Sequence, residues 1–244
     1  MKKRSQKLVS MVCVVATIAM TVSALFYPAT SGAYDGAGSV FRRSSDTNKI
    51  ALTFDDGPHP KYTEEILDLL REHGVKATFF VIGSNMEMFG KYAARAVREG
   101  HEIGNHTATH PHIKDMTYSD IVEELSRADD AVYSKTGKRT KLFRPPEGKC
   151  SPELQRACKD AGYSIILWSI DTVDWSGNPS ENIVREVLEN LRGGDIILFH
   201  DYVSRQNTTI DALRILIPKL KEMGYEFVTV SELIESDVCE SGTE

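Results

Sequence analysis

Carboxylate and imidazole side chains, which commonly bind metal ions, stand directly after two short apolar runs of this 244-residue sequence. Asp55 and Asp56 follow the first run, and His106 and His110 follow another. Two adjacent carboxylates repel each other, so a cation or a shared proton is needed to hold them together. Histidines four residues apart point in one direction when they lie on one helical turn, as in zinc hydrolases. With one aspartate, the pair predicts a site that binds a divalent metal and leaves positions open for water and substrate.

Each half of this pattern also has a simpler interpretation. Asp-Gly-Pro is a good turn sequence, so the aspartates can be turn or cap residues, and the histidines can be ordinary surface or capping groups. The combination is much more specific than either part, and it favours metal-dependent hydrolysis. Four histidines outside this pattern are expected to be structural or exposed: His59, His73, His101 and His112.

Three more side chains at the ends of apolar runs could take part in hydrolysis. His200 ends the run 196–199, where an imidazole is either a buried structural group or an acid or base in catalysis. Arg144 precedes two prolines that stiffen the backbone, so its guanidinium can hold a carboxylate in a fixed geometry; a surface ion pair is the alternative. Trp175 could belong to the core, but an indole on such a loop suits the flat apolar face of a sugar ring.

The elements that must position these residues alternate along the chain from Lys49 onward. Apolar runs expected to form strands are 50–54, 77–82, 102–104, 142–143, 163–168, 196–199 and 226–230. Amphipathic segments expected to form helices are 63–73, 87–99, 118–135, 152–161, 181–191 and 209–223. Strand followed by helix about seven times predicts an α/β fold, with a parallel sheet closed or nearly closed into a barrel. Loops at the carboxyl ends of parallel strands converge on one face, so the polar residues should meet there.

The first 33 residues are typical of an export signal. Four basic residues are followed by the uncharged run 8–26 and by small residues up to Ala33. Cleavage after Ala33 would secrete the protein. Retention would leave a signal anchor, because nineteen uncharged residues approach the length that spans a hydrocarbon core of about 30 Å; a buried core helix is the third alternative. The domain is therefore expected outside the cytoplasmic membrane, with membrane contact only through this segment.

The chain after this segment divides into three parts. We expect a linker over 34–47, a single catalytic domain over 48–235 and an unstructured tail over 236–244. The first 33 residues hold four of the 29 basic residues and none of the 35 acidic ones, so residues 34–244 carry a net charge of −10. Nucleic acid is bound through clustered lysine and arginine, and it is therefore not expected as a partner.

The cysteines outside the export segment are Cys150, Cys158 and Cys239. Cys158 is expected to be a buried apolar residue on a helix. One bridge, such as Cys150 to Cys239, is an open alternative. No pair of cysteines has the spacing of a thiolate zinc site.

Five segments, in this order, resemble the polysaccharide deacetylase family, also called carbohydrate esterase family 4 or the NodB-homology domain. They are 53–58, 106–110, 144–148, 171–175 and 198–201, of which Thr-Phe-Asp-Asp-Gly-Pro and His-Thr-x-x-His are the most specific. The resemblance covers residues 49–235. It implies a distorted (β/α) barrel and metal-dependent hydrolysis of an acetamide on a glycan.

The resemblance also implies a role for each polar residue. Asp55 matches the general base, and the matching metal ligands are Asp56, His106 and His110. The metal is expected to be one divalent ion, zinc before cobalt, nickel, iron or manganese. Arg144 matches the arginine that orients the base, and His200 matches the general acid. Asp174 matches the carboxylate that partners this acid, and Asp171 is the second choice.

Residues expected at the substrate are Pro145, Glu147, Trp175 and Leu198. A backbone N–H near Glu147 is expected to stabilise the oxyanion. The family usually has tyrosine at the position of Glu147. A carboxylate there indicates a cationic or hydrogen-bonding neighbour on the glycan.

These features favour one function among three. The first is de-N-acetylation of a cell-surface glycan, namely N-acetylglucosamine or N-acetylmuramic acid of peptidoglycan, or a chitooligosaccharide. The second is an esterase that acts on O-acetylated xylan. The third is a glycan-binding wall protein with weak or no catalysis, which is disfavoured because every ligand, base and acid is present. The partner in each case is a glycan, and the sequence leaves the oligomeric state undetermined.

Overall fold

The centre of the fold is a strand with buried side chains on both of its faces, β2 (Lys49–Asp55). Such a strand is typical of a parallel sheet that is covered by helices. The computed structural model describes residues 38–44, 48–202 and 208–240, all of which belong to one compact unit, Gly36–Glu244. The expected export segment over 1–33 lies outside the described residues. None of the helices in these ranges combines the length and the apolar character that crossing a membrane requires.

Within the described residues nine strands form one sheet, and every ladder between them is parallel. Besides β2, the strands are β1 (Val40–Phe41), β3 (Thr78–Val81), β4 (Glu102–Asn105), β5 (Leu142–Phe143), β6 (Ser164–Ile166), β7 (Ile170–Asp171), β8 (Ile196–His200) and β9 (Glu226–Phe227). Their order is β1-β6-β5-β4-β3-β2-β8-β7, with β9 also paired to β2. In the described part of the chain β1 and β7 do not pair, so the barrel stays open between them.

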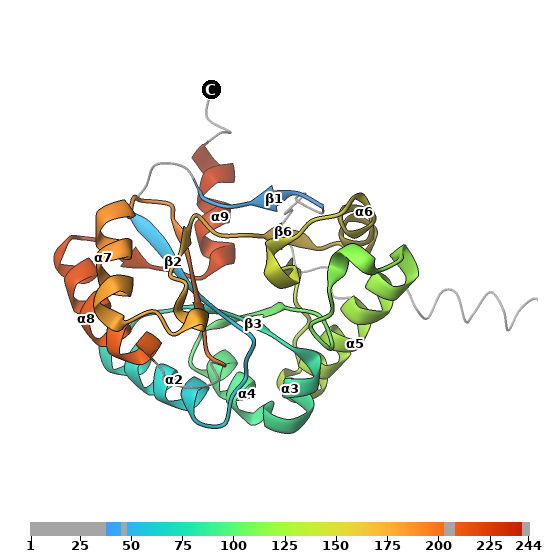
Figure 1. The fold of residues 1–244 in the computed structure, drawn as a ribbon, viewed down its shortest axis with the longest axis horizontal. Helices are drawn as coiled ribbons and strands as arrows, with labels where there is room; N and C mark the ends of the chain where they lie inside the picture. The colour runs from blue at the N-terminus through green and yellow to red at the C-terminus, as the bar shows by residue number, and fades with distance from the viewer. Residues whose placement is uncertain (1–37, 45–47, 203–207, 241–244) are drawn as a thin grey trace, which may run out of the picture. The chain divides into compact units, whose positions relative to one another are not determined.

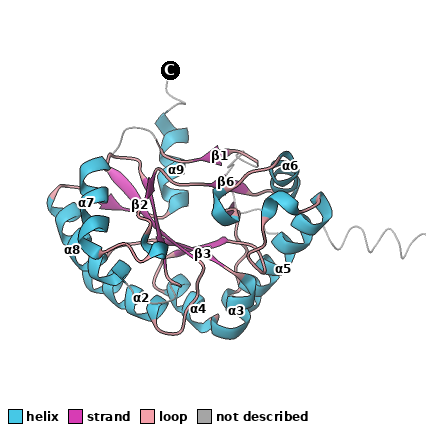
Figure 2. Cartoon of the chain, viewed as in Figure 1, coloured by secondary structure: helices cyan, strands magenta, loops and turns pink. Residues whose placement is uncertain are grey.

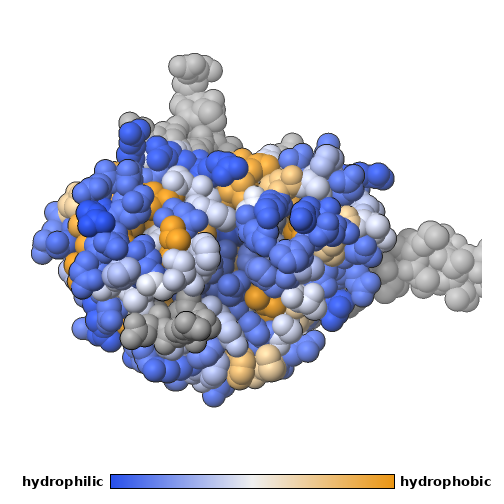
Figure 3. All heavy atoms as spheres, in the orientation of Figure 1, coloured by the Kyte–Doolittle hydropathy of each residue, from blue (hydrophilic) through white to orange (hydrophobic). Residues whose placement is uncertain are grey.

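Helices surround this sheet (Figure 1, Figure 2). They are α2 (Tyr62–His73), α3 (Gly83–Phe89), α4 (Lys91–Arg98), α5 (Tyr118–Thr136), α6 (Pro152–Ala161), α7 (Ser180–Asn190), α8 (Thr208–Glu222) and α9 (Val230–Glu240). Hydrophilic residues predominate on the face seen in Figure 3, where hydrophobic residues form small separate patches. The α/β barrel predicted from the alternating pattern is therefore confirmed.

Some elements differ from the expectation. The strands β1 and β7 were not predicted, and β1 lies inside the expected linker over 34–47. Each of these strands has only two residues, which is too few to give a periodic pattern in the sequence. The pairing of β1 and β7 is therefore decided by the neighbouring strands of the sheet. The single helix expected over 87–99 is two helices with Gly90 between them. A Cβ at Gly90 would lie 2.5 Å from the carbonyl oxygen of Met86, so the chain turns where no side chain fits.

The expected strand over 226–230 and the unstructured tail from 236 are also corrected. The strand β9 ends at Phe227, and α9 begins at Val230 and continues to Glu240. Thr229 and Glu232 form a reciprocal pair at its start: the backbone N–H of each donates to the side chain of the other, at 2.7 and 3.3 Å. This spacing of threonine and glutamate is a known signal for a helix start, and it was overlooked.

The core lies between β2 and the helices outside it. Phe54 stacks on Phe79 of β3 and on Phe199 of β8, with ring centroids 5.0 and 5.8 Å apart. A second apolar cluster under α6 includes Cys158, which is fully buried as predicted. Cys150 and Cys158 are free thiols, and the side chain of Cys239 lies outside the described residues.

The register of the sheet brings the ends of neighbouring strands side by side. Asp55, the last residue of β2, is paired with His200, the last residue of β8. The backbone N–H of Arg144 donates to Asn105 at the end of β4, at 3.0 Å. The residues that follow these strands must therefore share one face.

Two methionines of α3 test how much this core contributes to stability. Met86 is fully buried, whereas Met88 is 65% exposed. We expect Met86→Ala to lower the free energy of unfolding by about 2–5 kcal/mol, because it leaves a cavity. Met88→Ala should change it by less than about 0.5 kcal/mol. Urea denaturation followed by circular dichroism measures both, and equal losses would contradict this packing.

Candidate active site

A buried arginine holds the first aspartate of the site. Arg144 is 0% exposed, and its Nη1 donates to Asp55 Oδ1 at 2.7 Å and to Thr53 Oγ1 at 2.8 Å. Its Nε and Nη2 donate to the carbonyl oxygens of Ile166 and Leu167, both at 3.2 Å. These bonds fix the guanidinium, so the alternative of a surface ion pair is excluded. Asp55 is 3% exposed, and its Oδ2 lies 3.8 Å from His106 Nε2.

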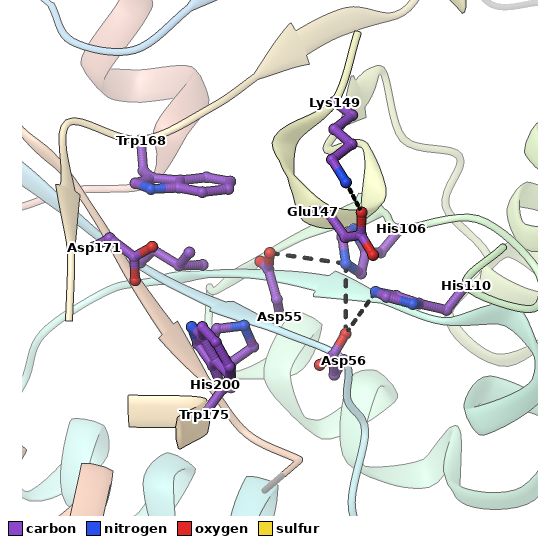
Figure 4. A pocket seen from close by; sticks show the side chains of 11 residues that line it. Asp55, Asp56, His106, His110, Glu147, Lys149, Trp168, Asp171, Trp175 and His200 are labelled. Carbon is purple, nitrogen blue, oxygen red and sulfur yellow. Dashed lines mark hydrogen bonds and ion pairs between the residues drawn. The ribbon is translucent and has the colours of Figure 1, made fainter. Parts of the chain in front are cut away.

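The second aspartate lies between the two histidines, as Figure 4 shows. Asp56 Oδ1 is 3.4 Å from His106 Nε2 and 3.5 Å from His110 Nε2. His106 Nδ1 is bonded to the carbonyl oxygen of Arg144 at 2.7 Å, which leaves Nε2 to act as a ligand. One ligand atom from each of Asp56, His106 and His110 lies within 4.8 Å of the others. Asp56 Oδ1 is buried without a hydrogen-bond partner, as expected of an atom that binds a cation.

The pKa values of Asp56 and His106 are shifted toward their charged forms, whereas burial and the charge of His106 lower the pKa of His110. Burial raises the pKa of Asp56, but the close approach and charge of His106 outweigh it and lower this pKa. Burial lowers the pKa of His106, but the charges of Asp55 and Asp56 outweigh it and raise this pKa. The donor set of one carboxylate and two imidazoles therefore fits a divalent metal.

The histidines are not placed by a helical turn, which corrects the expectation from their spacing. Residues 106–110 form a loop after β4, in which Thr107 and His110 have left-handed backbones with φ of 70° and 57°. Asn105 Oδ1 accepts from the N–H of Thr107 at 2.8 Å, and Thr107 Oγ1 accepts from the N–H of His110 at 3.0 Å. Glu124 of α5 accepts from the N–H of Thr109 at 2.8 Å. Asn105 and Glu124 are thus positioning residues that the sequence pattern did not identify.

Backbone strain is concentrated around this site. Among the described residues, non-glycine residues with positive φ are Asp56, Thr107, His110, Glu147 and Val173, all in loops after strands β2, β4, β5 and β7. Such conformations cost about 1–3 kcal/mol each and are common at functional sites.

His200 stands on the opposite side of Asp55 from His106 and His110 (Figure 4), where it contacts the carboxylate of Asp174. His200 Nδ1 is 2.7 Å from Asp174 Oδ1, and the N–H of His200 donates to Asp174 Oδ2 at 2.9 Å. Burial lowers the pKa of His200, but the hydrogen bond and charge of Asp174 outweigh it and raise this pKa to about 9. His200 is thus protonated at neutral pH. Asp171 instead accepts from the N–H of Val173 at 2.9 Å, so Asp174 is the partner of His200.

These groups share one pocket of about 490 Å³. Its lining consists of Asp55, Asp56, His106, His110, Glu147, Lys149, Trp168, Asp171, Trp175, Leu198 and His200. Arg144 and Asp174 act from behind this lining. Pro145, expected at the substrate, is buried outside it; its carbonyl oxygen accepts from the N–H of Gly148 at 2.9 Å, so it shapes the loop.

Two lining residues were missed by the sequence analysis. Trp168 follows β6 at the carboxyl end of the sheet, but the run 163–168 was assigned wholly to a strand. A Cβ at Gly148 would lie 2.7 Å from Trp168 Cη2, so the indole packs directly on the loop after β5. Lys149 on that loop carries no signal in its residue type. The position after a strand was the one signal that could have identified Trp168.

The carboxylate of Glu147 is occupied by groups of the protein itself. Its Oε1 lies 3.0 Å from His112 Nδ1, and its Oε2 accepts from Lys149 Nζ. The hydrogen bond from Lys149 is the main reason that the pKa of Glu147 is lowered. The cationic neighbour of Glu147, which was expected on the glycan, is instead Lys149 of the chain itself, and His112 is exposed as predicted.

Comparisons with known proteins agree with this arrangement. A family model for polysaccharide deacetylase matches residues 42–166. A peptidoglycan-N-acetylglucosamine deacetylase of Bacillus cereus is 41% identical over 187 residues, which is 76% of this chain and 87% of the relative. A chitooligosaccharide deacetylase of Azorhizobium caulinodans is 32% identical over 77% of this chain and 95% of the relative. The crystal structure of a peptidoglycan N-acetylglucosamine deacetylase superposes with a TM-score of 0.78 at 36% identity, covering 80% of this chain and 92% of that chain.

Metal binding can be tested with two histidines of different exposure. We expect His110→Ala to weaken Zn²⁺ binding by more than about 100-fold. Loss of a residue that only hydrogen-bonds to a metal ligand typically weakens binding by about 10- to 100-fold, and loss of the ligand itself should have a larger effect. His112→Ala is the control, because His112 is exposed and its ring contacts only Glu147 among these groups. Isothermal titration calorimetry measures both. Equal affinity in the two variants would refute the ligand set.

Proposed function

The chain belongs to the polysaccharide deacetylase family, and on this premise we propose which residues of this hydrolase remove an acetyl group and from which glycan. The substrate is an N-acetylated cell-surface glycan, with N-acetylglucosamine or N-acetylmuramic acid of peptidoglycan before chitooligosaccharide. The observation that carries the proposal is the single pocket in which Asp55 lies between the Asp56, His106 and His110 cluster and His200. In this arrangement Asp55 can accept a proton on one side of the amide bond of the substrate, and His200 can donate one on the other side.

Asp56, His106 and His110 hold the metal, for which zinc is the first choice because imidazole and carboxylate are its usual ligands in hydrolases. A bound divalent ion polarises a carbonyl group and lowers the pKa of a bound water molecule toward neutrality. The carbonyl oxygen of Arg144 keeps His106 in the tautomer with a free Nε2.

Asp55 is the general base. Arg144 Nη1 donates to Asp55 Oδ1 at 2.7 Å, and Asp55 Oδ2 lies 3.8 Å from His106 Nε2. This oxygen accepts a proton from the attacking water while the water oxygen bonds to the acetyl carbon. The backbone N–H near Glu147 donates to the oxygen that becomes negative.

His200 is the general acid. Its imidazolium, stabilised by Asp174, gives its Nε2 proton to the amide nitrogen as the carbon–nitrogen bond breaks. The products are acetate and a free amino sugar. Because Asp55 and His200 are partners on adjacent strands, the acid and the base stay at a fixed separation.

The pocket walls suit an acetylated sugar. Leu198 lines the pocket at 3% exposed and supplies an apolar contact for the acetyl methyl group. Trp175 is 59% exposed and offers a flat face for a sugar ring. Glu147, tied to Lys149 and His112, forms a polar rim in place of an aromatic ring.

The protein acts outside the cytoplasmic membrane. A peptidoglycan deacetylase must reach the cell wall, and the first 33 residues have the composition of an export signal. The position of this segment lies outside the described residues.

Acetate release from defined glycans tests the proposal. We expect the full chain to release acetate from peptidoglycan and from N-acetylchitooligosaccharide, to lose this activity with a chelator and to regain it with Zn²⁺. Asp55→Asn should keep Zn²⁺ affinity but lower kcat by about 100- to 10,000-fold, because the proton acceptor is lost. Release from acetylated xylan alone would identify an esterase. Glycan binding without release from any substrate would identify a binding protein.

The pH dependence of this activity tests the pairing of His200. The pKa of His200 is raised to about 9, so the acid is protonated below this pH and activity should fall as pH rises through about 9. Asp174→Asn removes the main group that raises this pKa, so the fall should move to lower pH. Asp171→Asn is the matched control and should leave it in place. The same shift in both variants would refute the assignment of Asp174.

A further inference from the structure

Three aromatic side chains form a cluster outside the pocket, two on the loops that follow β2 and β8 and one at the start of α2. His59 stacks on Tyr62, with ring centroids 4.6 Å apart and an angle of 18° between the planes. Tyr202 lies perpendicular to His59, at 4.8 Å and 86°. His59 is three residues from Asp56, and Tyr202 is two residues from His200. None of these rings lines the pocket, so none contacts the acetyl group that reacts there.

Hydrogen bonds fix the orientation of the central ring. His59 Nδ1 accepts from the N–H groups of Lys61 and Tyr62, both at 3.2 Å. Nδ1 is therefore the acceptor nitrogen, and the proton is on Nε2. Burial and the charge of Lys61 lower the pKa of His59, which keeps this ring neutral at neutral pH. The central ring of the cluster is thus neutral and fixed in one orientation.

A buried carboxyl group ties the cluster to the catalytic strands. The N–H of His59 donates to Thr63 Oγ1 at 2.7 Å, and this hydroxyl donates to Asp201 Oδ2. Asp201 is 0% exposed, and its own N–H donates to the carbonyl oxygen of Asp55 at 3.1 Å. A Cβ at Gly57 would lie 2.2 Å from Asp201 Oδ2, so the loop after β2 packs directly on this carboxyl group. His59 therefore keeps a fixed position relative to the catalytic base.

The outermost ring of the cluster is available to a ligand. Tyr202 is 44% exposed, although it is held by His59 on one side. A rigid aromatic ring with exposed surface is suited to the apolar face of a sugar, because little side-chain freedom is lost on binding. The cluster lies on segments that follow the strands of the pocket, but none of its rings lines the pocket itself. The ligand that meets both is a polymer that extends from the pocket across Tyr202.

We propose that Tyr202, supported by His59 and Tyr62, is a binding site for a sugar residue that lies beyond the reacting one on the same glycan chain. This inference rests on the proposed deacetylase function, since it assigns the class of ligand. Stacking of this sugar residue on Tyr202 makes the protein bind long glycan chains more tightly than short ones. It takes no part in the chemical step.

Kinetics on a short and a long substrate test this site. We expect Tyr202→Ala to raise KM for the N-acetylchitooligosaccharide pentamer by about 3- to 10-fold, which corresponds to the loss of one aromatic contact. The KM for the dimer and kcat for both substrates should stay within twofold of wild type. Tyr202→Phe keeps the ring and should restore the wild-type KM. Tyr133→Ala is the matched control, because Tyr133 is 51% exposed on α5 and packs against Arg139.

The inference is overturned if Tyr202→Ala changes KM equally for the pentamer and the dimer, or changes neither KM. Calorimetric affinities for both oligomers, measured in the Asp55→Asn background, separate this failure from a failure of the proposed function. Wild-type protein that releases no acetate would refute the function. A loss of pentamer affinity confined to Tyr202→Ala would still support the sugar site, and unchanged affinity would refute it.

Discussion

The site depends on one charge buried inside the barrel, the guanidinium of Arg144. A fully buried arginine is costly to desolvate unless each donor is paired, and here the donors are shared among β2, β6 and the residue after β6. Its carbonyl oxygen also orients His106. One residue therefore sets the position of Asp55, the proposed base, through its side chain and that of His106, a proposed metal ligand, through its backbone. Removal of one partner from such a pair typically costs about 3–5 kcal/mol, so the stability of the barrel and the geometry of the site are coupled.

A second buried pair sets the opposite side of the pocket. Asp174 contacts both the ring and the backbone N–H of His200, and Thr209 Oγ1 donates to Asp174 Oδ2 at 2.6 Å. The two aspartates of the acid and base thus have different partners, an arginine for Asp55 and a histidine for Asp174. Because each charge has its own counter-charge, the pocket can hold a base and a protonated acid at the same pH.

The residue types and the strand ends were predictable from the sequence, because carboxylates, imidazoles and an arginine after apolar runs must converge at one edge of a parallel sheet. The route by which His106 and His110 meet was not predictable from their spacing. It depends on left-handed backbone at Thr107 and on the side chain of Asn105, neither of which gives a periodic signal. The roles of Lys149 and Trp168 in the lining arise from packing between distant loops. The short strands β1 and β7 likewise depend on pairing partners far along the chain.

The contact between Gly57 and Asp201 limits how this loop can vary. The carboxyl group fills the space that any side chain at position 57 would need, and burial together with the nearby charges of Asp56 and Asp55 raises the pKa of Asp201 to about 7. A library randomised at position 57 and selected for the folded enzyme would consequently return glycine, whatever glycan the selection used. Variation in substrate preference must instead arise at the exposed ends of the loops, where side chains can change without moving the strand that carries the base.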